Sequence, residues 1–265
     1  MIDDGPVLLS LDDDGVARLT LNRPDASNGM DVPFLRALHD AIMRCHGEPG
    51  VRVVILSGNG PSFCAGGDVK TFASKGERLP DYLREATSWL QISASALMRL
   101  GPPVIAAVHG FAAGGGGFGL VCAADLVVAA ESAKFLPGAT RVGMAPDAGT
   151  TVTLQRIVGV RRAMEILLTN PTLTTAQARE LGIVTRVVPD SELVAEVDAL
   201  ARELTAGAPL ALAETKRLVW DGVGRSVEDC LPDEARTVSA LSGTADAREG
   251  LDAVIQRRAP RFEGR

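Results

Sequence analysis

Two apolar strand segments, each followed directly by a glycine-rich turn, constrain most strongly what this chain can fold into. Residues 51–57 read Val-Arg-Val-Val-Ile-Leu-Ser, and residues 104–108 form a second apolar run. Near-continuous apolar runs of this length are typical of parallel strands that are buried on both faces of a sheet. The glycine turns at 63–68 and 113–119 come next and each precedes an expected helix. The sequence therefore predicts an α/β fold with ligand-binding turns at the ends of two strands.

The rest of the chain extends this pattern. Further strands are expected at 7–11, 16–21, 126–130 and 183–188. Asp31 is a good N-cap for a helix whose apolar face carries Leu35, Leu38, Ile42 and Cys45. Helices alone are expected beyond Asp190, at roughly 191–206, 209–220, 226–241 and 246–258. We therefore divide the chain into a core, residues 1–195, and a C-terminal helical region, residues 196–265.

Composition excludes several functional classes. The chain has 265 residues, 46% of them apolar, and a net charge of −6, which argues against a nucleic-acid partner. Its cysteines form no CxxC motif, and three histidines make a metal site improbable. Widely spaced cysteines and an acidic N-terminus without a signal peptide predict a cytoplasmic protein. Residues 100–124 carry no charge, but prolines and glycines interrupt them, so we expect a buried strand, turn and helix and no membrane span.

The glycine turns and one aspartate indicate a chemistry. Glycine lets the backbone approach a ligand closely, and N–H groups from two turns can form an oxyanion hole. A carboxylate beside such a hole can move a proton at the carbon next to a carbonyl. Asp147, in Gly-Met-Ala-Pro-Asp-Ala-Gly, is the candidate. Two simpler interpretations remain open: the turns pack helices on strands, and Asp147 caps a helix that begins near Thr150.

Other candidate residues carry weaker signals. Gly114, Gly116 and Gly119 spell GxGxxG, but they lie mid-chain without an acidic residue at the distance that a dinucleotide site requires. His109 is expected to be structural, and Cys64 has no obvious histidine partner. Asp125 is interpreted as a residue at the edge of a strand.

Several segments, in order along nearly the whole chain, resemble the crotonase (enoyl-CoA hydratase/isomerase) superfamily. They are Leu-Asn-Arg-Pro at 21–24, Phe-Cys-Ala-Gly-Gly-Asp at 63–68, Ala-Ala-Val-His-Gly at 106–110, Ser-Ala-Lys-Phe at 132–135, Arg-Ala-Met-Glu at 162–165, Ala-Arg-Glu-Leu-Gly-Ile-Val at 178–184 and the C-terminal segments at 246–253 and 258–262. The resemblance implies a spiral of ββα turns with a C-terminal helical region that packs trimers, often paired into hexamers.

The resemblance also implies a substrate and its binding residues. An acyl-CoA thioester would place its oxygen on the N–H groups of Gly67 and Gly116. CoA would lie along Ala65, Gly67, Asp68, Val69 and Lys70, with Arg23 and Ala26 near its nucleotide end. CoA would arrive with the substrate, so no metal or redox cofactor is expected.

The chain departs from the family pattern at two positions. Typical hydratases of the family add water between two glutamates, and the corresponding positions here are Gly119 and Ala139.

Asp147 lies eight residues beyond the second position, where certain isomerases of the family, including the ring-epoxide isomerase of phenylacetyl-CoA breakdown, carry an aspartate. We therefore predict an acyl-CoA isomerase that uses Asp147. The alternatives are an enoyl-CoA hydratase of low or broad activity and a non-catalytic acyl-CoA-binding protein. A loop from Thr71 to Trp89 is expected to border the acyl pocket.

Overall fold

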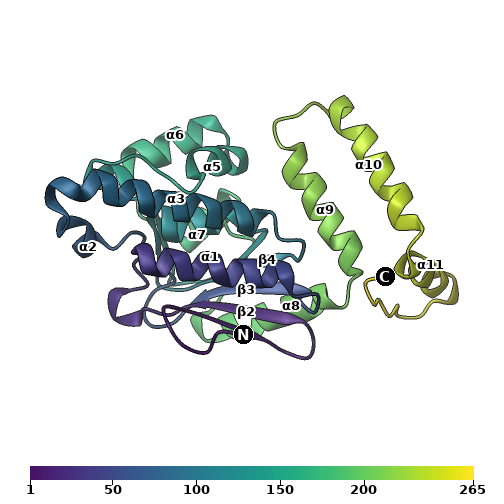
Figure 1. Ribbon diagram of the computed structural model, residues 1–265. Coiled ribbons are helices and arrows are strands. Elements are labelled where there is room, and N and C mark those ends of the chain that lie inside the picture. The colour runs from purple at the N-terminus through teal and green to yellow at the C-terminus, as the bar shows by residue number, and fades with distance from the viewer.

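A mixed six-stranded sheet forms the centre of the computed structural model, which describes residues 1–265 (Figure 1). Its order is β1-β2-β3-β4-β6-β9, in which β1 and β2 are antiparallel and all other neighbours are parallel. The strands are β1 (Val7–Leu11), β2 (Val16–Leu21), β3 (Val53–Gly58), β4 (Val104–Val108), β6 (Leu126–Ala130) and β9 (Arg186–Val188). All of β4 and most of β3 are buried, as their apolar sequences predict.

A second, three-stranded sheet lies where the glycine turns meet. It is formed by β5 (Phe111–Ala113), β7 (Lys134–Leu136) and β8 (Leu173–Thr174). Cys64 pairs with Ala112 of β5, so the first glycine turn is attached directly to the strand that leads into the second turn. This pairing brings together two turns that are about 50 residues apart in the sequence.

Helices surround the two sheets. They are α1 (Val32–Gly47), α2 (Val69–Ala73), α3 (Leu79–Met98), α4 (Leu120–Ala123), α5 (Thr150–Val158), α6 (Val160–Thr169), α7 (Thr175–Glu180), α8 (Leu193–Thr205), α9 (Pro209–Gly222), α10 (Val227–Ser242) and α11 (Ala245–Gln256). Helix α1 contacts β1 and β2 and lies beside α3, whereas α8 packs on β3, β4 and β6 (Figure 1). None of the helices combines the length and the apolar composition that crossing a bilayer requires.

Most predicted elements are present, with a few differences. Asp31 caps α1 by accepting the N–H of Phe34 at 2.9 Å, and the four predicted apolar positions of this helix are buried. The strand predicted at 51–57 begins at Val53, and the strand predicted at 183–188 is shorter. Residues 71–89, predicted as a loop, mostly belong to α2 and α3, because Pro80 starts a helix whose apolar residues recur on one face.

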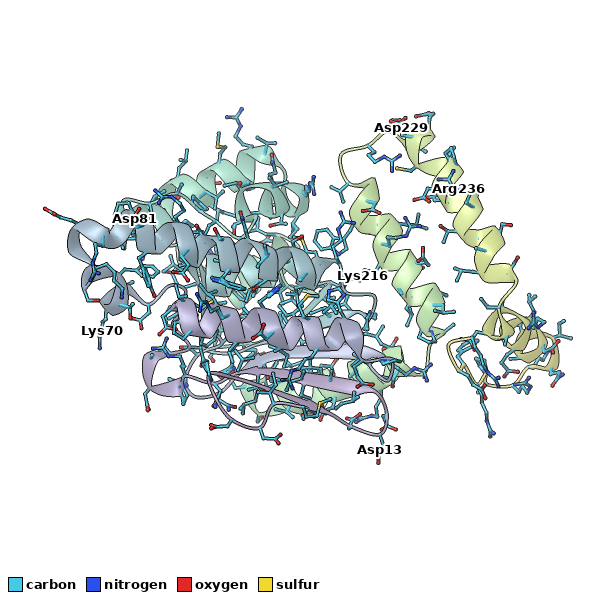
Figure 2. All side chains as sticks on the ribbon, in the orientation of Figure 1. Asp13, Lys70, Asp81, Lys216, Asp229 and Arg236 are labelled. Atoms are coloured by element: carbon cyan, nitrogen blue, oxygen red, sulfur yellow. The ribbon has the colours of Figure 1, made fainter.

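The C-terminal helices α10 and α11 project away from the core, and α9 connects them to it (Figure 1). A buried ion pair anchors α9: Lys216 Nζ lies 2.7 Å from Asp125 Oδ2, and the indole N–H of Trp220 donates to Asp125 Oδ1 at 2.8 Å. Figure 2 shows Lys216 on the side of α9 that faces the core. Asp125 lies at the end of a strand as predicted, directly before β6, and its carboxylate also joins the sheet to the helical region.

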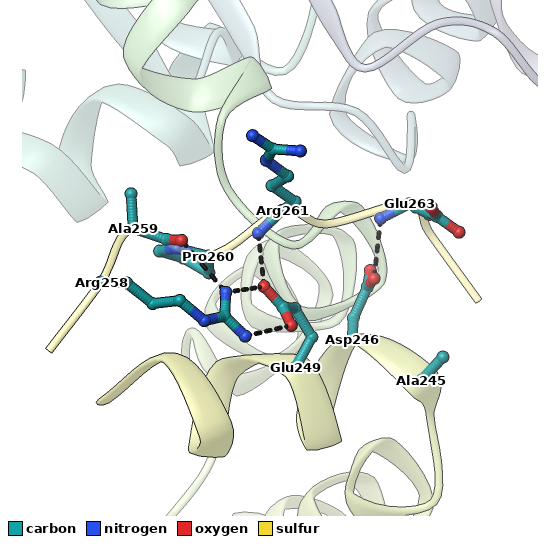
Figure 3. A pocket seen from close by; sticks show the side chains of 8 residues that line it. All are labelled: Ala245, Asp246, Glu249, Arg258, Ala259, Pro260, Arg261 and Glu263. Atoms are coloured by element: carbon teal, nitrogen blue, oxygen red, sulfur yellow. Dashed lines mark hydrogen bonds and ion pairs between the residues drawn. The ribbon is translucent and has the colours of Figure 1, made fainter. Parts of the chain in front are cut away.

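The last residues fold back along α11 (Figure 3). Arg258 forms two bonds to the Glu249 carboxylate, at 2.6 and 2.8 Å, and the backbone N–H of Arg261 donates to the same carboxylate at 2.9 Å. Asp246 accepts the backbone N–H groups of Glu263 and Gly264 at 2.7 and 2.8 Å. A hollow of about 670 Å³ lies here, but both of its helical carboxylates are already paired within the tail. This arrangement indicates a structural clamp.

Candidate active site

The first glycine turn leaves one backbone N–H without an acceptor. Ala65 donates to the carbonyl of Ser27 at 2.9 Å, Gly66 to the sulfur of Cys64 at 3.4 Å, and Asp68 to the carbonyl of Met30 at 3.0 Å. The N–H of Gly67 has no partner in the turn. Because an unpaired N–H in a closed turn is costly unless a ligand or water meets it, Gly67 is the donor that this turn presents.

The second glycine turn opens a short π-helix, Gly115–Gly119, which continues into α4. Gly116 is its second residue, so its N–H lies in the first turn, where a helix provides no acceptor of its own. The partial positive charge of a helix N-terminus also lies at this end of the segment. Single π-turns of this kind occur frequently at functional sites.

The close approach of the two turns requires glycine. A methyl group on Gly66 would lie 2.8 Å from the carbonyl oxygen of Ala113. A methyl group on Gly116 would lie 2.6 Å from Met30 Sδ and 3.3 Å from Cys64 Sγ. The two turns are therefore tightly packed, and this packing brings Gly67 and Gly116 into the lining of one cavity.

Asp147 lies directly against the second turn. A methyl group on Gly115 would occupy the position of Asp147 Oδ1, so only glycine at 115 admits the carboxylate. The helix α5 is capped by Gly149 and shows no side-chain cap, so the simpler interpretation of Asp147 as an N-cap is wrong. Ala148, which lies between Asp147 and Gly149, has a φ of +52°, a conformation in which non-glycine residues are uncommon.

The environment of Asp147 favours its neutral form. Its carboxylate forms no ion pair with any lysine, arginine or histidine, and burial raises the pKa of Asp147, only partly offset by its own backbone N–H. An unpaired acid with a raised pKa in a cavity is typical of a residue that transfers protons.

Residues of both glycine turns and Asp147 line a cavity of about 600 Å³. Gly67, Gly116 and Asp147 line it together, and Asp147 is the only carboxylate among the lining residues. Its remaining walls are largely apolar and come from α2, α3 and the segment before Asp147; they include Phe72, Leu79, Leu83, Leu90, Leu136, Ala139, Val142 and Met144. The cavity can therefore hold an apolar group with one polar atom at the two N–H donors and one carbon near Asp147.

The two positions where typical hydratases carry glutamates differ in this structure. Ala139 lines the cavity with a side chain that cannot transfer a proton. At Gly119 a side chain has no room, because its first carbon would lie 2.8 Å from Thr150 Oγ1 and 2.9 Å from the methyl carbon of Ala148. The side chains of Ala148 and Thr150, which follow Asp147, thus occupy the space that a side chain at 119 would need.

The predicted CoA-binding residues are partly gathered at the cavity. Ala65, Gly67 and Val69 line it, together with Gly116. Asp68 does not line it: its carboxylate caps α2 and lies 3.2 Å from Arg23 Nη2. Arg23 also pairs with Asp31 at 3.1 Å, which places this guanidinium between the N-terminal caps of α1 and α2. Lys70 is exposed on α2 (Figure 2), and Ala26 lies in a 3₁₀ turn outside the cavity lining.

Neighbouring aromatic, thiol and imidazole groups have structural roles. The hydroxyl of Tyr82 accepts the N–H of Val32 at 3.1 Å, and Trp89 packs on His39 with ring centres 5.7 Å apart. Burial raises the pKa of Cys64 to about 12, so this thiol is not a nucleophile. The ring Nε2 of His109 lies 2.9 Å from the Gly60 carbonyl oxygen, as a structural histidine would.

One buried polar residue near the site, Asn28, was not singled out from the sequence. Asn28 is fully buried, and its side-chain amide bonds to the loop that leads into the first glycine turn. The available signal was the Asn-Gly pair at 28–29, since asparagine tolerates the left-handed conformation that Asn28 adopts at a φ of +57°.

The fold and the paired turns define a class of protein. Residues 12–265 match the Enoyl-CoA hydratase/isomerase family, so the chain belongs to this family, and its fold is the crotonase fold.

Three relatives illustrate the range of the family. The chain is 37% identical to a probable enoyl-CoA hydratase of Rhodobacter capsulatus, over 95% of this chain and 96% of the relative. It is 33% identical to the 1,2-epoxyphenylacetyl-CoA isomerase of Escherichia coli, over 97% and 98%. The crystal structure of an enoyl-CoA hydratase from Mycobacterium smegmatis superposes with a TM-score of 0.91, at 33% identity over 98% and 99% of the two chains. The relatives of this chain thus include proteins named as hydratases and as isomerases.

Proposed function

We propose that the protein is an acyl-CoA isomerase in which Asp147 is the sole general acid and base. The observation that carries the proposal is that Asp147 is the only carboxylate lining the cavity that also contains Gly67 and Gly116. The apolar walls suit an acyl group, and the family binds thioesters of CoA. CoA would reach the cavity along Ala65 and Val69, and it would arrive as part of the substrate.

The reaction follows from this arrangement. The thioester oxygen accepts the N–H groups of Gly67 and Gly116. Asp147 removes a proton from a carbon conjugated with the thioester, and the electron pair moves onto the oxygen as an enolate. The same carboxyl group returns the proton at another carbon, so that a double bond migrates or a strained ring opens and no atom is gained or lost. Each N–H donor contributes roughly 3–4 kcal/mol to lowering the barrier.

Hydration of an enoyl group requires more than the site offers. Water addition needs one group that activates the water and a proton donor at the neighbouring carbon, which two carboxylates can share. Ala139 cannot serve, and position 119 has no room for a side chain. A raised pKa suits a single carboxyl that must both accept and return a proton.

The proposal is tested by replacing the carboxylate with an amide of the same shape. Asp147→Asn should lower kcat by at least about 100-fold on 2-enoyl, 3-enoyl, dienoyl or ring-epoxide CoA thioesters, since general acid–base catalysis contributes about that much. Asp13→Asn, in an exposed hairpin, is the matched control and should keep the parent rate (Figure 2). If Asp147→Asn retains turnover within a few-fold of the parent on every substrate, the proposed mechanism is wrong.

A further inference from the structure

We infer that Asn28 is a positioning residue for the oxyanion hole, one that holds the first glycine turn so that the Gly67 N–H faces the thioester oxygen. The inference rests on the proposed use of Gly67 as a donor. Asn28 does not line the cavity, and it acts through the backbone that it binds.

The side chain of Asn28 joins two segments that are distant in the sequence. Its Nδ2 lies 2.9 Å from the carbonyl oxygens of Asn59 and Ser62 and 3.0 Å from that of Phe63. Its Oδ1 accepts the backbone N–H of Arg23 at 2.8 Å. All four polar contacts are to backbone groups; two belong to the loop between β3 and the first glycine turn, and a third is to Phe63, the first residue of that turn. This amide therefore sets the path by which the chain enters the turn.

The backbone on either side of Asn28 continues the same attachment. The Ser27 carbonyl accepts from Ala65, the Met30 N–H donates to Gly66 at 2.8 Å, and the Met30 carbonyl accepts from Asp68. The Asn28 carbonyl itself accepts the thiol of Cys64 at 3.2 Å. These bonds engage the polar backbone groups on both sides of Gly67, so that the Gly67 N–H is the one N–H of the turn that has no acceptor. The register of residues 27–30 against the turn thus selects which N–H is presented.

Neither aspartate nor serine supplies this set of contacts at this site. An aspartate would direct a second oxygen at three carbonyl oxygens, and a serine is shorter and has a single O–H in place of the amide's two N–H hydrogens. Asn28 also adopts a left-handed φ of +57°, which asparagine tolerates better than most residues. Since catalytic groups must be held to within about 0.5 Å of their working geometry, a loosened turn would weaken the Gly67 donor without removing it.

The test separates positioning from simple structural support. Asn28→Ser should lower kcat about tenfold or more, short of the roughly 100-fold loss of a whole donor. The affinity for a saturated acyl-CoA, measured by calorimetry, should stay within a few-fold of the parent. The ¹³C resonance of the bound thioester carbonyl reports hydrogen bonding to its oxygen, and it should move toward the position of the free thioester. Asn59→Ala is the matched control, because its exposed side chain lies on the same loop, and it should leave all three values unchanged.

Two results would overturn the inference: an unchanged ¹³C shift in Asn28→Ser, or loss of acyl-CoA affinity in parallel with kcat. Because the ¹³C measurement uses a saturated thioester that cannot isomerise, it stands even if the proposed reaction is wrong. Should Asn28→Ser not fold, hydrogen exchange of the parent decides. Backbone amides of residues 63–66 should then exchange as slowly as those of β4, and fast local exchange would contradict a held turn.

Discussion

At the scale of single residues, Asp147, the proposed general acid and base, carries a cost in stability. Burial raises its pKa in the folded protein, so the folded state disfavours the charged form. Because the folded-state pKa lies above that of the unfolded chain, the stability present at low pH is lost as the pH rises through the folded-state value. A buried, unpaired carboxylate of this kind is destabilising at neutral pH.

Asp147→Asn should therefore stabilise the protein at pH 7. The amide has no charged form to disfavour, so the free energy of unfolding should exceed that of the parent. The gain should vanish below about pH 3.9, where the free aspartate is also protonated. Urea denaturation of parent and variant across this range measures the difference. A variant that is less stable than the parent at pH 7 would contradict this account of the carboxylate.

The residue scale also shows where sequence reasoning stops. The glycine turns were predicted because glycine is the residue that close backbone approach requires. Whether Asp147 caps α5 or faces the cavity could not be decided from its Pro-Asp-Ala-Gly turn, because both need the same local sequence. The contact with Gly115, which decides the question, links residues 32 positions apart. Asn28 was missed for the same reason, since three of the four partners of its side chain lie more than 30 positions away.

At the scale of elements, long apolar strands were predicted well and short ones were not. The strands at 7–11, 16–21, 104–108 and 126–130 agree with the sequence patterns at both ends. The three-residue strands β5 and β7 carry too few residues for a period to appear, and their pairing depends on where β4 and β6 place them. The second sheet, which holds the two turns together, was therefore not predicted.

The Lys216–Asp125 ion pair is a main attachment of helix α9 to the core. Lys216 is also within 3.2 Å of the Pro102 carbonyl, and burial lowers its pKa although Asp125 opposes the shift. Lys216→Met should cost up to about 3–5 kcal/mol of unfolding free energy, because it removes the cation that pairs with the largely enclosed Asp125 carboxylate. Lys70→Met removes an exposed lysine and serves as the control (Figure 2). Equal unfolding midpoints for the two variants would show that the ion pair does not anchor the helix.

At the scale of the whole molecule, the C-terminal helices present an apolar face to solvent. Helix α11 exposes 67% of Leu251 and 78% each of Val254 and Ile255, and α10 exposes Val227, Leu231 and Val238. Exposed apolar patches of this kind mark protein interfaces. We propose that further copies of this chain cover them, in a homotrimer or a dimer of trimers.

The assembly is measured by light scattering coupled to size exclusion. The parent should elute with three or six times the chain mass of 27.7 kDa. Val254→Glu should shift the protein to smaller species, because a charge cannot be buried unpaired in an interface. Gln256→Glu, two residues further along α11, should leave the mass unchanged. A monomeric parent, or a Val254→Glu variant of unchanged mass, would refute the interface.

The central claim, that one carboxyl group moves a proton and no water is added, is tested most directly by a double isotope experiment. The parent is incubated with an enoyl-CoA in deuterated water that also carries ¹⁸O, and the acyl product is analysed by mass spectrometry and NMR. The account predicts a rearranged product of unchanged composition, with deuterium on carbon where solvent exchange competes with proton return, and no ¹⁸O. An acyl group carrying ¹⁸O in a new hydroxyl would show that the protein adds water, and the single-carboxylate mechanism would be wrong.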